Sequence, residues 1–388
     1  MPQLLEGVFN GISIGSVLLI AALGLAIVFG LMGVINLAHG ELMMLGAYST
    51  FVVQNCFKPL GEPWLSYYIW VALPIAFVVA ALAGLALERG VIRFLYGRPL
   101  ETLLATWGVS LILRQFVRSV NGAMVIGIAL FCLLFFGGIF ILSRRIDWSR
   151  IRTWVTPIIL TLSLGITTAV SVLLFKSGQE AITKPWFSAR NVDVTAPKWL
   201  QGGLPIGSFQ VPYARVFIIC LTIICILGTY WFLNRSVWGL RIRAVTQNRS
   251  MSSCLGIPTQ KVDALTFSLG SGLAGIAGCA ITLLGSVGPN TGQNYIVDTF
   301  MVVVVGGVGN LVGTILAALV IGTVSYIIGS GTLALMVPPI ESLKPLVDLL
   351  TFFATTSMAK VLVFALIIAF LQVRPSGIFP QKGRMVDG

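Results

Sequence analysis

The chain has 388 residues, of which 57% are hydrophobic and only 10% are charged. A soluble domain carries about 25% charged residues, so this composition excludes an ordinary soluble protein and indicates a polytopic membrane protein. The formal net charge of +12 would suit a nucleic-acid-binding protein, but the Lys and Arg residues are divided among segments that separate long apolar runs. The basicity therefore predicts contact with anionic membrane lipid or a cytoplasmic partner, and no nucleic acid.

Apolar runs recur from one end of the chain to the other. We expect an all-α protein with about ten transmembrane helices, each needing about 20 apolar residues, in a single membrane domain covering 1–388. The first run has no basic residues before it and is too long for a signal peptide, so we expect a retained span. The predicted spans are 7–31, 42–56, 65–87, 102–120, 122–143, 155–175, 213–233, 263–287, a broken element at 296–329, and 357–373.

The basic residues predict how these spans are oriented. They gather at 88–101, at 144–152, at 235–261 and in the C-terminal tail. Cytoplasmic loops carry an excess of Lys and Arg, so we place all four segments in the cytoplasm. The N-terminus then lies outside and the C-terminus inside, and residues 176–212 form a long outside loop.

The first span ends in a stretch that interrupts the apolar pattern. Residues 33–48 read GVINLAHGELMMLGAY and contain Asn36, His39 (the chain's only histidine) and Glu41. Glycine-interrupted apolar segments mark the discontinuous helices that line transporter pathways, so we predict a broken element near 31–42 and place these three residues in the substrate pathway. Structural alternatives stay open: Asn36 caps the next helix, Glu41 stabilises its first turn, and His39 is an interfacial residue.

A second interruption, near 303–312, has a similar sequence. Residues 307–313 read GVGNLVG and place Asn310 where the first break has Asn36. Two such breaks suggest two related halves, each with a broken helix. Just before it, residues 285–298 (GSVGPNTGQNYIVD) predict an outside loop with polar groups that lead into the break. We assign four residues of this region to the pathway, namely Asn290, Tyr295, Asp298 and Asn310.

A glycine-rich run at 270–278, GSGLAGIAG, contains the pattern G-x-G-x-x-G. It lies inside an apolar span and not in the soluble βαβ unit that a dinucleotide site needs. Small residues recur here at every fourth position, which lets membrane helices approach closely. We assign this packing role to Gly270, Ser271, Ala274, Gly275 and Gly278.

The sequence gives little support to an enzyme. It has no Gly-Lys dipeptide and hence no Walker A loop, so another subunit would have to bind any ATP. Six cysteines without a Cys-x-x-Cys pair, and a single histidine, predict no metal and no cofactor. An intramembrane serine protease that pairs Ser110 or Ser271 with His39 is the enzyme alternative, although nothing in the sequence sets a base beside either serine.

The cytoplasmic loop at 235–262 reads RSVWGLRIRAVTQNRSMSSCLGIPTQKV. It predicts one short basic helix from Arg241 to Leu255, which Gly256 and Pro258 end. Such a helix either lies on lipid headgroups or docks into a partner.

At this loop and in four other places, the chain resembles the branched-chain amino acid permease family of bacterial ATP-binding-cassette importers, and within it the urea-importer permeases. The segments are GVINLAHGELMMLGAY (33–48), RPLETLLATWGVSLILRQ (98–115), GLRIRAVTQNRSMSSCLGIPTQKVDALTFSLGSGLAGIAG (239–278), GSVGPNTGQNYIVDTFMVVVVGGVGNLVGT (285–314) and AKVLVFALIIAFLQVRPSGIF (359–379).

The resemblance implies a place in the bacterial inner membrane, with 176–212 in the periplasm. It implies a second homologous permease subunit, two cytoplasmic ATP-binding subunits and a periplasmic substrate-binding protein. It also implies that 235–262 is a coupling loop that docks on the ATPase, although the glutamate of the importer motif E-A-A-x-x-x-G is absent. The coupling residues expected from it are Arg241, Arg243, Arg249, Ser252, Ser253 and Gly256.

The chain departs from the family pattern at 122–175, where two additional spans predict an inserted helix pair that leaves the topology unchanged. The solute that the resemblance implies is urea, with a branched-chain amino acid or another small amide as the alternative. Only His39, Glu41 and Asp298 carry charge in the predicted pathway, which favours the neutral solute. A stand-alone channel or a secondary transporter is a further alternative.

Overall fold

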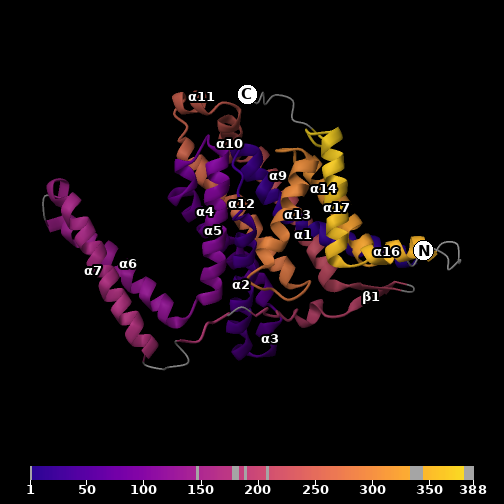
Figure 1. The fold of residues 1–388 in the computed structure, drawn as a ribbon, viewed down its shortest axis with the longest axis horizontal. Coiled ribbons are helices and arrows are strands. Elements are labelled where there is room, and N and C mark those ends of the chain that lie inside the picture. The colour runs from indigo at the N-terminus through magenta and orange to yellow at the C-terminus, as the bar shows by residue number, and fades with distance from the viewer. Residues whose placement is uncertain are drawn as a thin grey trace. The chain divides into compact units, whose positions relative to one another are not determined.

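The computed structural model describes residues 2–145, 148–176, 183–187, 190–206, 209–332 and 344–379. The chain divides into two compact units. The larger unit comprises Met1–Leu111 and Val192–Gly388, and the smaller comprises Ile112–Asn191. Helices dominate both units (Figure 1).

The helices of the larger unit include two that are buried, several that face outward and two that are short and basic. They are α1 (Pro2–Met32), α2 (His39–Phe57), α3 (Glu62–Leu65), α4 (Tyr68–Gly90), α9 (Tyr213–Arg235), α10 (Val237–Gln247), α11 (Arg249–Cys254), α12 (Thr259–Thr282), α13 (Thr291–Gly306), α14 (Leu311–Gly329), α16 (Lys344–Phe353) and α17 (Thr356–Val373). Short 3-10 turns lie at Lys58–Leu60, Ile92–Phe94 and Lys198–Leu200. In Figure 1, α10 and α11 lie at one end of this unit and α3 at the other.

The smaller unit contains the predicted inserted pair. α5 (Pro99–Ser119) runs from the larger unit into the smaller, which continues with α6 (Gly122–Arg145) and α7 (Trp148–Lys176). A Cβ atom on Gly127 of α6 would lie close to the Ser171 hydroxyl of α7, so a small residue lets these two helices pack.

The prediction of a polytopic helical membrane protein is confirmed. Among the described residues, seven helices are long and apolar enough to cross a membrane, and Ser357–Val373 is a shorter apolar helix. Each predicted span coincides with a helix, and the expected break in 296–329 lies between α13 and α14. The described residues depart from an all-α fold in one hairpin, where β1 (Gly203–Ile206) pairs antiparallel with β2 (Phe209–Pro212).

Two helices form the centre of the larger unit. α1 is apolar on all sides, and nearly every side chain from Val17 to Val28 is buried. A helix that is apolar all round belongs in an interior. α12 is also largely buried, but it is rich in glycine and alanine, and it packs against α1, α2 and α4. Its small side chains allow three neighbours to reach its backbone.

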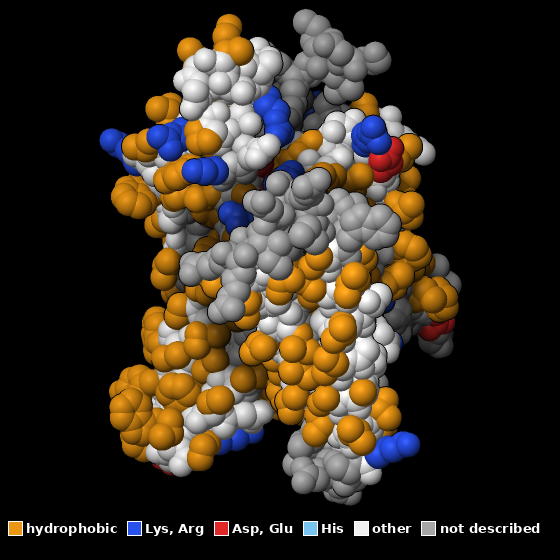
Figure 2. Space-filling model, turned by 90° about the vertical axis from the view of Figure 1, so that its left-hand side faces the viewer, with side chains coloured by type: hydrophobic (Ala, Val, Ile, Leu, Met, Phe, Trp, Pro, Cys, Tyr) orange, Lys and Arg blue, Asp and Glu red, His pale blue; other side chains and the backbone are white. Residues whose placement is uncertain are grey.

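The other long helices turn large apolar side chains outward. Exposed residues of this kind on α4 and α9 include Trp70, Leu82, Leu227 and Trp231. Figure 2 shows hydrophobic side chains over much of the visible face, with Lys and Arg side chains near the top of the view and at its lower edge. This distribution suits a surface in contact with lipid, bordered by charged ends.

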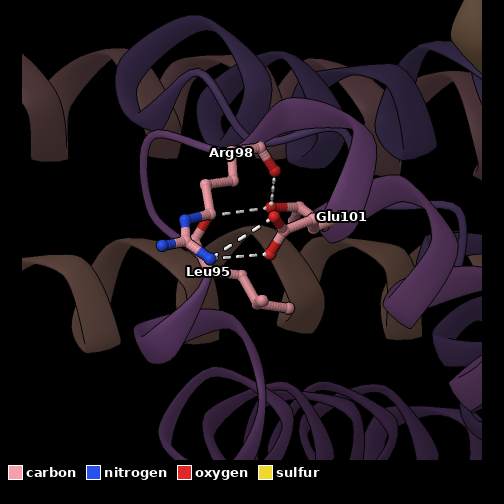
Figure 3. A network of polar contacts seen from close by, with 4 residues as sticks. Leu95, Arg98 and Glu101 are labelled. Carbon is pink, nitrogen blue, oxygen red and sulfur yellow. Dashed lines mark hydrogen bonds and ion pairs between the residues drawn. The ribbon is translucent and has the colours of Figure 1, made fainter.

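α5 begins with a set of exposed polar contacts (Figure 3). Arg98 precedes Pro99, which suits the first helical position because proline has no N–H to satisfy there. The Arg98 Nη1 lies 3.1 Å from Glu101 Oε2, and the two side chains are 67% and 54% exposed. Glu101 also places negative charge in the first turn, where the helix dipole favours it.

Candidate functional site

The first predicted break is a non-helical segment that runs back along α1. Residues 33–38 carry no helix, and Gly33 has a φ of 68°. At the end of this segment, His39 Nε2 lies 3.0 Å from the carbonyl oxygen of Ala21. Ala21 precedes the end of α1 by eleven residues, which is about 16 Å of helix. α2 therefore begins about one third of the way back along α1 and not at its end.

Two backbone N–H groups of this segment find acceptors inside the protein. The N–H of Leu37 donates to Thr106 Oγ1 of α5 (3.2 Å), and the N–H of Ala38 donates to Asn36 Oδ1 (3.0 Å). Asn36 is buried. Non-helical backbone at membrane depth is tolerated only where protein or water surrounds it, and here protein does so. Ala38 occupies the cap position of α2, so Asn36 folds the chain just before the helix and does not cap it.

The starts of two helices meet beside this segment. A Cβ atom on Gly40 of α2 would collide with the carbonyl oxygen of Gly292 in α13, and one on Gly292 would collide with that of Gly40. Only glycine permits so close an approach. The positive ends of two helix dipoles therefore converge at one buried point. We call the contact of Gly40 with Gly292 the helix-start junction.

Glu41 lies at the helix-start junction. Its side chain is buried, and its Oε1 accepts a hydrogen bond of 3.0 Å from Ser110 Oγ of α5. Two helix starts and a hydroxyl donor stabilise a carboxylate at this point. His39 is also fully buried, so the interfacial alternative for it is wrong. Because a carbonyl oxygen only accepts, His39 Nε2 donates to Ala21.

Among the described residues, neither candidate serine is hydrogen-bonded to His39 as a serine protease would require. Ser110 is bonded to Glu41, the Ser271 hydroxyl donates to the carbonyl of Phe267, and His39 is bonded to Ala21. A G-x-S-x-G pattern does occur at 11–15, but it lies within α1, and both of its glycines pack against α14. The pattern therefore serves helix packing.

The second break is a tight turn, unlike the first. Gly307 and Gly309 have φ angles of 100° and 83°, which favour glycine. Asn310 caps α14, with its Oδ1 accepting from the N–H groups of Val312 (3.0 Å) and Gly313 (3.2 Å). The similar sequences at 33–40 and 307–313 thus adopt different backbones, and the element that meets the start of α2 is the start of α13.

The C-terminal segment closes this turn. The N–H groups of Ile378 and Phe379 donate to the carbonyls of Val305 (2.8 Å) and Gly306 (3.4 Å). Asn310 Nδ2 donates to the carbonyl of Phe379 at 3.5 Å. These bonds satisfy carbonyl groups that the end of α13 leaves free.

A cavity of about 590 Å³ lies between α1, α13, α14 and α17. It contains an ion pair, in which Asp298 Oδ2 of α13 lies 2.7 Å from Lys360 Nζ of α17. Lys360 Nζ also donates to the carbonyl of Asn294 (3.1 Å) and lies 5.9 Å from the ring centre of Tyr295. Ile14 and Leu18 of α1 supply apolar wall.

The cavity changes one prediction about charge. Asp298 was expected to contribute a charge without a partner, and Lys360 was not assigned to the pathway. The structure places the two side chains together, 12% and 36% exposed, so the cavity presents both signs of charge. A lysine in the second turn of an apolar span was the sequence signal, because such residues usually have an ionic partner.

The predicted pathway residues fall into separate groups. Asn36, His39 and Glu41 lie at the first break, and Asn290 occupies the cap position of α13. Tyr295 and Asp298 line the cavity. Asn310 lies at the opposite end of α13, about 24 Å of helix away from Asn290.

The loop at 235–262 forms two helices and not the single predicted one. α10 ends before Asn248, which caps α11 by accepting from the N–H of Met251 (3.0 Å). Gly256, with a φ of 80°, follows α11. The polar side chain of an asparagine hydrogen-bonds to nearby backbone, which disfavours a continuous helix and favours the start of a new one.

The buried side of α10 reaches both breaks. Ile242 and Val245 pack in one cluster with Leu31, which ends α1, and Leu311, which begins α14. Of the predicted coupling residues, Arg243 Nη1 donates to Asn234 Oδ1 (3.3 Å) and Arg241 lies over the Trp238 ring. Ser252 is buried, whereas Ser253 and Gly256 are exposed.

The small residues of α12 face different helices. A Cβ atom on Gly270 would collide with α1 at Gly24, one on Gly275 with α4 at Ala76, and one on Gly278 with α2 at Met43. The Ser271 hydroxyl lies against Gly84 of α4, and Ala274 is fully buried in the core. These contacts fix the distance between α12 and the helices around it.

Comparisons with known proteins agree with this architecture. Residues 7–371 match the family described as branched-chain amino acid transport system / permease component. The high-affinity branched-chain amino acid transport system permease protein LivH of Escherichia coli (strain K12) is 25% identical over 378 residues, covering 96% of this chain and 94% of the relative. The corresponding protein BraD of Pseudomonas aeruginosa is 24% identical, covering 83% of this chain and 86% of the relative.

A probable branched-chain amino acid permease of Methanocaldococcus jannaschii is 25% identical over 82% of this chain and 78% of its own length. No solved structure matches the chain significantly. Because the match to the family covers nearly the whole chain, the protein is a transport subunit and not an enzyme. It belongs to the family of branched-chain amino acid transport system permease components.

Proposed function

We propose that this chain is the transmembrane permease subunit of an ATP-binding-cassette importer in a bacterial inner membrane. The solute is small and carries no net charge. The observation behind this proposal is the cavity of about 590 Å³ that holds the Asp298–Lys360 pair. The pair offers one acceptor group and one donor group, and their charges cancel.

A branched-chain amino acid is the first candidate solute. Its ammonium group matches the Asp298 carboxylate, its carboxylate matches the Lys360 ammonium, and its side chain matches the apolar wall at Ile14 and Leu18. The names of the curated relatives support this choice. Urea is the second candidate, because its N–H groups and carbonyl can use the same acceptor and donor, and because the sequence resembles urea permeases.

The two breaks support alternating access as the mechanism. Packed helices change arrangement by hinging at short non-helical segments, and this chain has such segments at 33–38 and 307–310. α10 shares one apolar cluster with residues beside both of them. A movement of α10 would therefore reach the two hinges together.

The cytoplasmic loop supports an external source of energy. α10 and α11 expose Leu240, Met251 and Leu255 among the basic residues of the loop. We propose that this surface docks on an ATP-binding subunit. The complete importer then has two such subunits, a second homologous permease and a periplasmic substrate-binding protein. The N-terminus lies outside and the C-terminus in the cytoplasm.

Uptake into proteoliposomes tests the proposal. The chain is purified with its ATP-binding subunits and second permease, reconstituted with ATP inside the vesicles, and supplied with the substrate-binding protein outside. We expect ATP-dependent uptake of either ¹⁴C-leucine or ¹⁴C-urea, competed by the same unlabelled solute. Leucine uptake selects the first candidate and urea uptake the second. Passage of solute through the permease alone, without ATP, would show a channel instead.

A further inference from the structure

Arg249 connects the cytoplasmic loop to two other parts of the larger unit. It is the first residue of α11, and its Nη2 lies 2.5 Å from Asp263 Oδ2 in the second turn of α12. Its guanidinium also lies 4.7 Å from the ring centre of Tyr96, between α4 and α5. The Asp263 side chain is only 5% exposed, so Arg249 is its counter-charge in a largely buried place.

Tyr96 extends this connection to α4. Its hydroxyl donates to Glu88 Oε1 at 3.4 Å, and Glu88 is buried near the end of α4. Burial, together with the neighbouring carboxylates of Asp263 and Glu88, raises the pKa of the Tyr96 phenol above its ordinary value of 10.0. The phenol therefore remains protonated and remains a donor.

The Tyr96 side chain also borders a cluster that includes residues of the first break. It packs against a buried apolar cluster that contains Val34 and Ala38 of the segment 33–38, and Phe267 of α12. A flat guanidinium over an aromatic ring gains both electrostatic and stacking energy. Arg249 therefore contacts, through one side chain, the start of α12 and a ring packed against the cluster that includes residues of the segment 33–38.

We propose that Arg249 is a positioning residue that passes movement of α10 and α11 to α12 and to the segment 33–38. The inference rests on the proposed function. It adds the contacts of Arg249 with Asp263 and Tyr96, which we call the Arg249 contacts, as the route by which ATP-driven movement of the loop reaches the membrane helices. The apolar packing of α10 through Ile242 and Val245 also includes Val262 of α12, but it uses other side chains than the Arg249 contacts. The loop can therefore stay docked on the ATP-binding subunit when the Arg249 contacts are removed.

The test compares solute transported per ATP hydrolysed in the complete reconstituted importer. Arg249→Ala removes both contacts, whereas Arg249→Lys keeps a charge for Asp263 but loses the flat group over Tyr96. Tyr96→Phe keeps the ring and loses the bond to Glu88. Couplings of this kind are worth 0.5–2 kcal/mol, so we expect Arg249→Ala to lower the ratio about 2- to 30-fold with ATP hydrolysis retained. Arg249→Lys should give an intermediate fall.

Arg98→Ala is the matched control. Arg98 is also an ion-paired arginine at a helix start, but its partner Glu101 is exposed (Figure 3), and we expect an unchanged ratio. Size-exclusion chromatography shows whether each complex assembles. If Arg249→Ala fails to assemble, Arg249→Lys and Tyr96→Leu carry the test, and wild-type ratios in both would overturn the inference.

The outcomes separate this inference from the proposed function. Absence of ATP-dependent uptake in the wild type would contradict the proposed function itself. A wild type that couples normally, with Arg249→Ala coupling equally well, would refute only the role of Arg249. A charge exchange, Arg249→Asp with Asp263→Arg, should recover part of the ratio if the ion pair contributes.

Discussion

Replacing Gly278 by alanine tests how α12 is packed against α2. A Cβ atom at this position would overlap the carbonyl oxygen of Met43 and lie 2.9 Å from the backbone nitrogen of Ala47. Both are backbone atoms of α2, so no side chain can turn away to make room. Non-bonded heavy atoms pack best at about 3.5–4.0 Å, which requires the Met43 carbonyl of α2 to retreat by about 1.5 Å or more.

The expected cost follows from this displacement. Overfilling a well-packed core costs about 1–3 kcal/mol. Gly228→Ala in α9 is the matched control, because nothing lies within 4 Å of its added carbon and alanine favours a helix by about 1 kcal/mol. Alanine gains this propensity at both positions, so the two variants should differ by the overpacking cost alone, about 1–3 kcal/mol in the free energy of unfolding.

Thermal unfolding in detergent, followed by fluorescence-detected size-exclusion chromatography, measures this difference. Gly278→Ala should unfold at a lower temperature than the wild type, and Gly228→Ala at the same or a higher one. Uptake should fall with Gly278→Ala as well, since displaced α2 carries the helix-start junction with it. Equal melting temperatures for the two alanine variants would refute the packing argument.

Three further variants test other contacts of the site. Asp298→Asn leaves Lys360 without its counter-charge. We expect the half-saturating solute concentration for uptake to rise about tenfold, a free-energy loss between those measured for exposed and for buried ion pairs. Unchanged uptake kinetics would show that the pair is not part of the pathway. Asn310→Ala removes the cap of α14 and should cost about 1 kcal/mol of stability in a thermal melt, whereas Asn310→Asp, which keeps the acceptor, should not. Ser110→Ala takes a donor from buried Glu41 and should cost about 1–3 kcal/mol in the same melt, with Ser110→Thr as the variant that retains it.

The helical spans could be predicted because their signal is local. Apolar length identifies a membrane helix from its own residues, and the basic segments between the spans are equally visible. The small-residue pattern at 270–278 also identified a helix that neighbours approach closely. It could not show which neighbour each glycine meets, because Gly24, Met43 and Ala76 lie in three different helices.

The centre of the site depends on contacts between distant residues. Gly40 and Gly292 are 252 positions apart, so nothing in either stretch indicates that two helix starts meet there. The likeness of 33–40 to 307–313 pointed instead to the turn at Asn310. The pairing of Asp298 with Lys360 was missed for the same reason, although a lysine in an apolar span invites a search for a carboxylate.

The bond between the C-terminal segment and α13 has a practical consequence. The N–H groups of Ile378 and Phe379 donate to the carbonyls of Val305 and Gly306, so these two residues are held at the point where the chain reverses into α14. A spectroscopic label near Phe379 would report on that reversal without altering any residue of the cavity. Trimming the chain after Val373 would remove the donors of these two carbonyls, and a fusion tag placed there would disturb the same bonds.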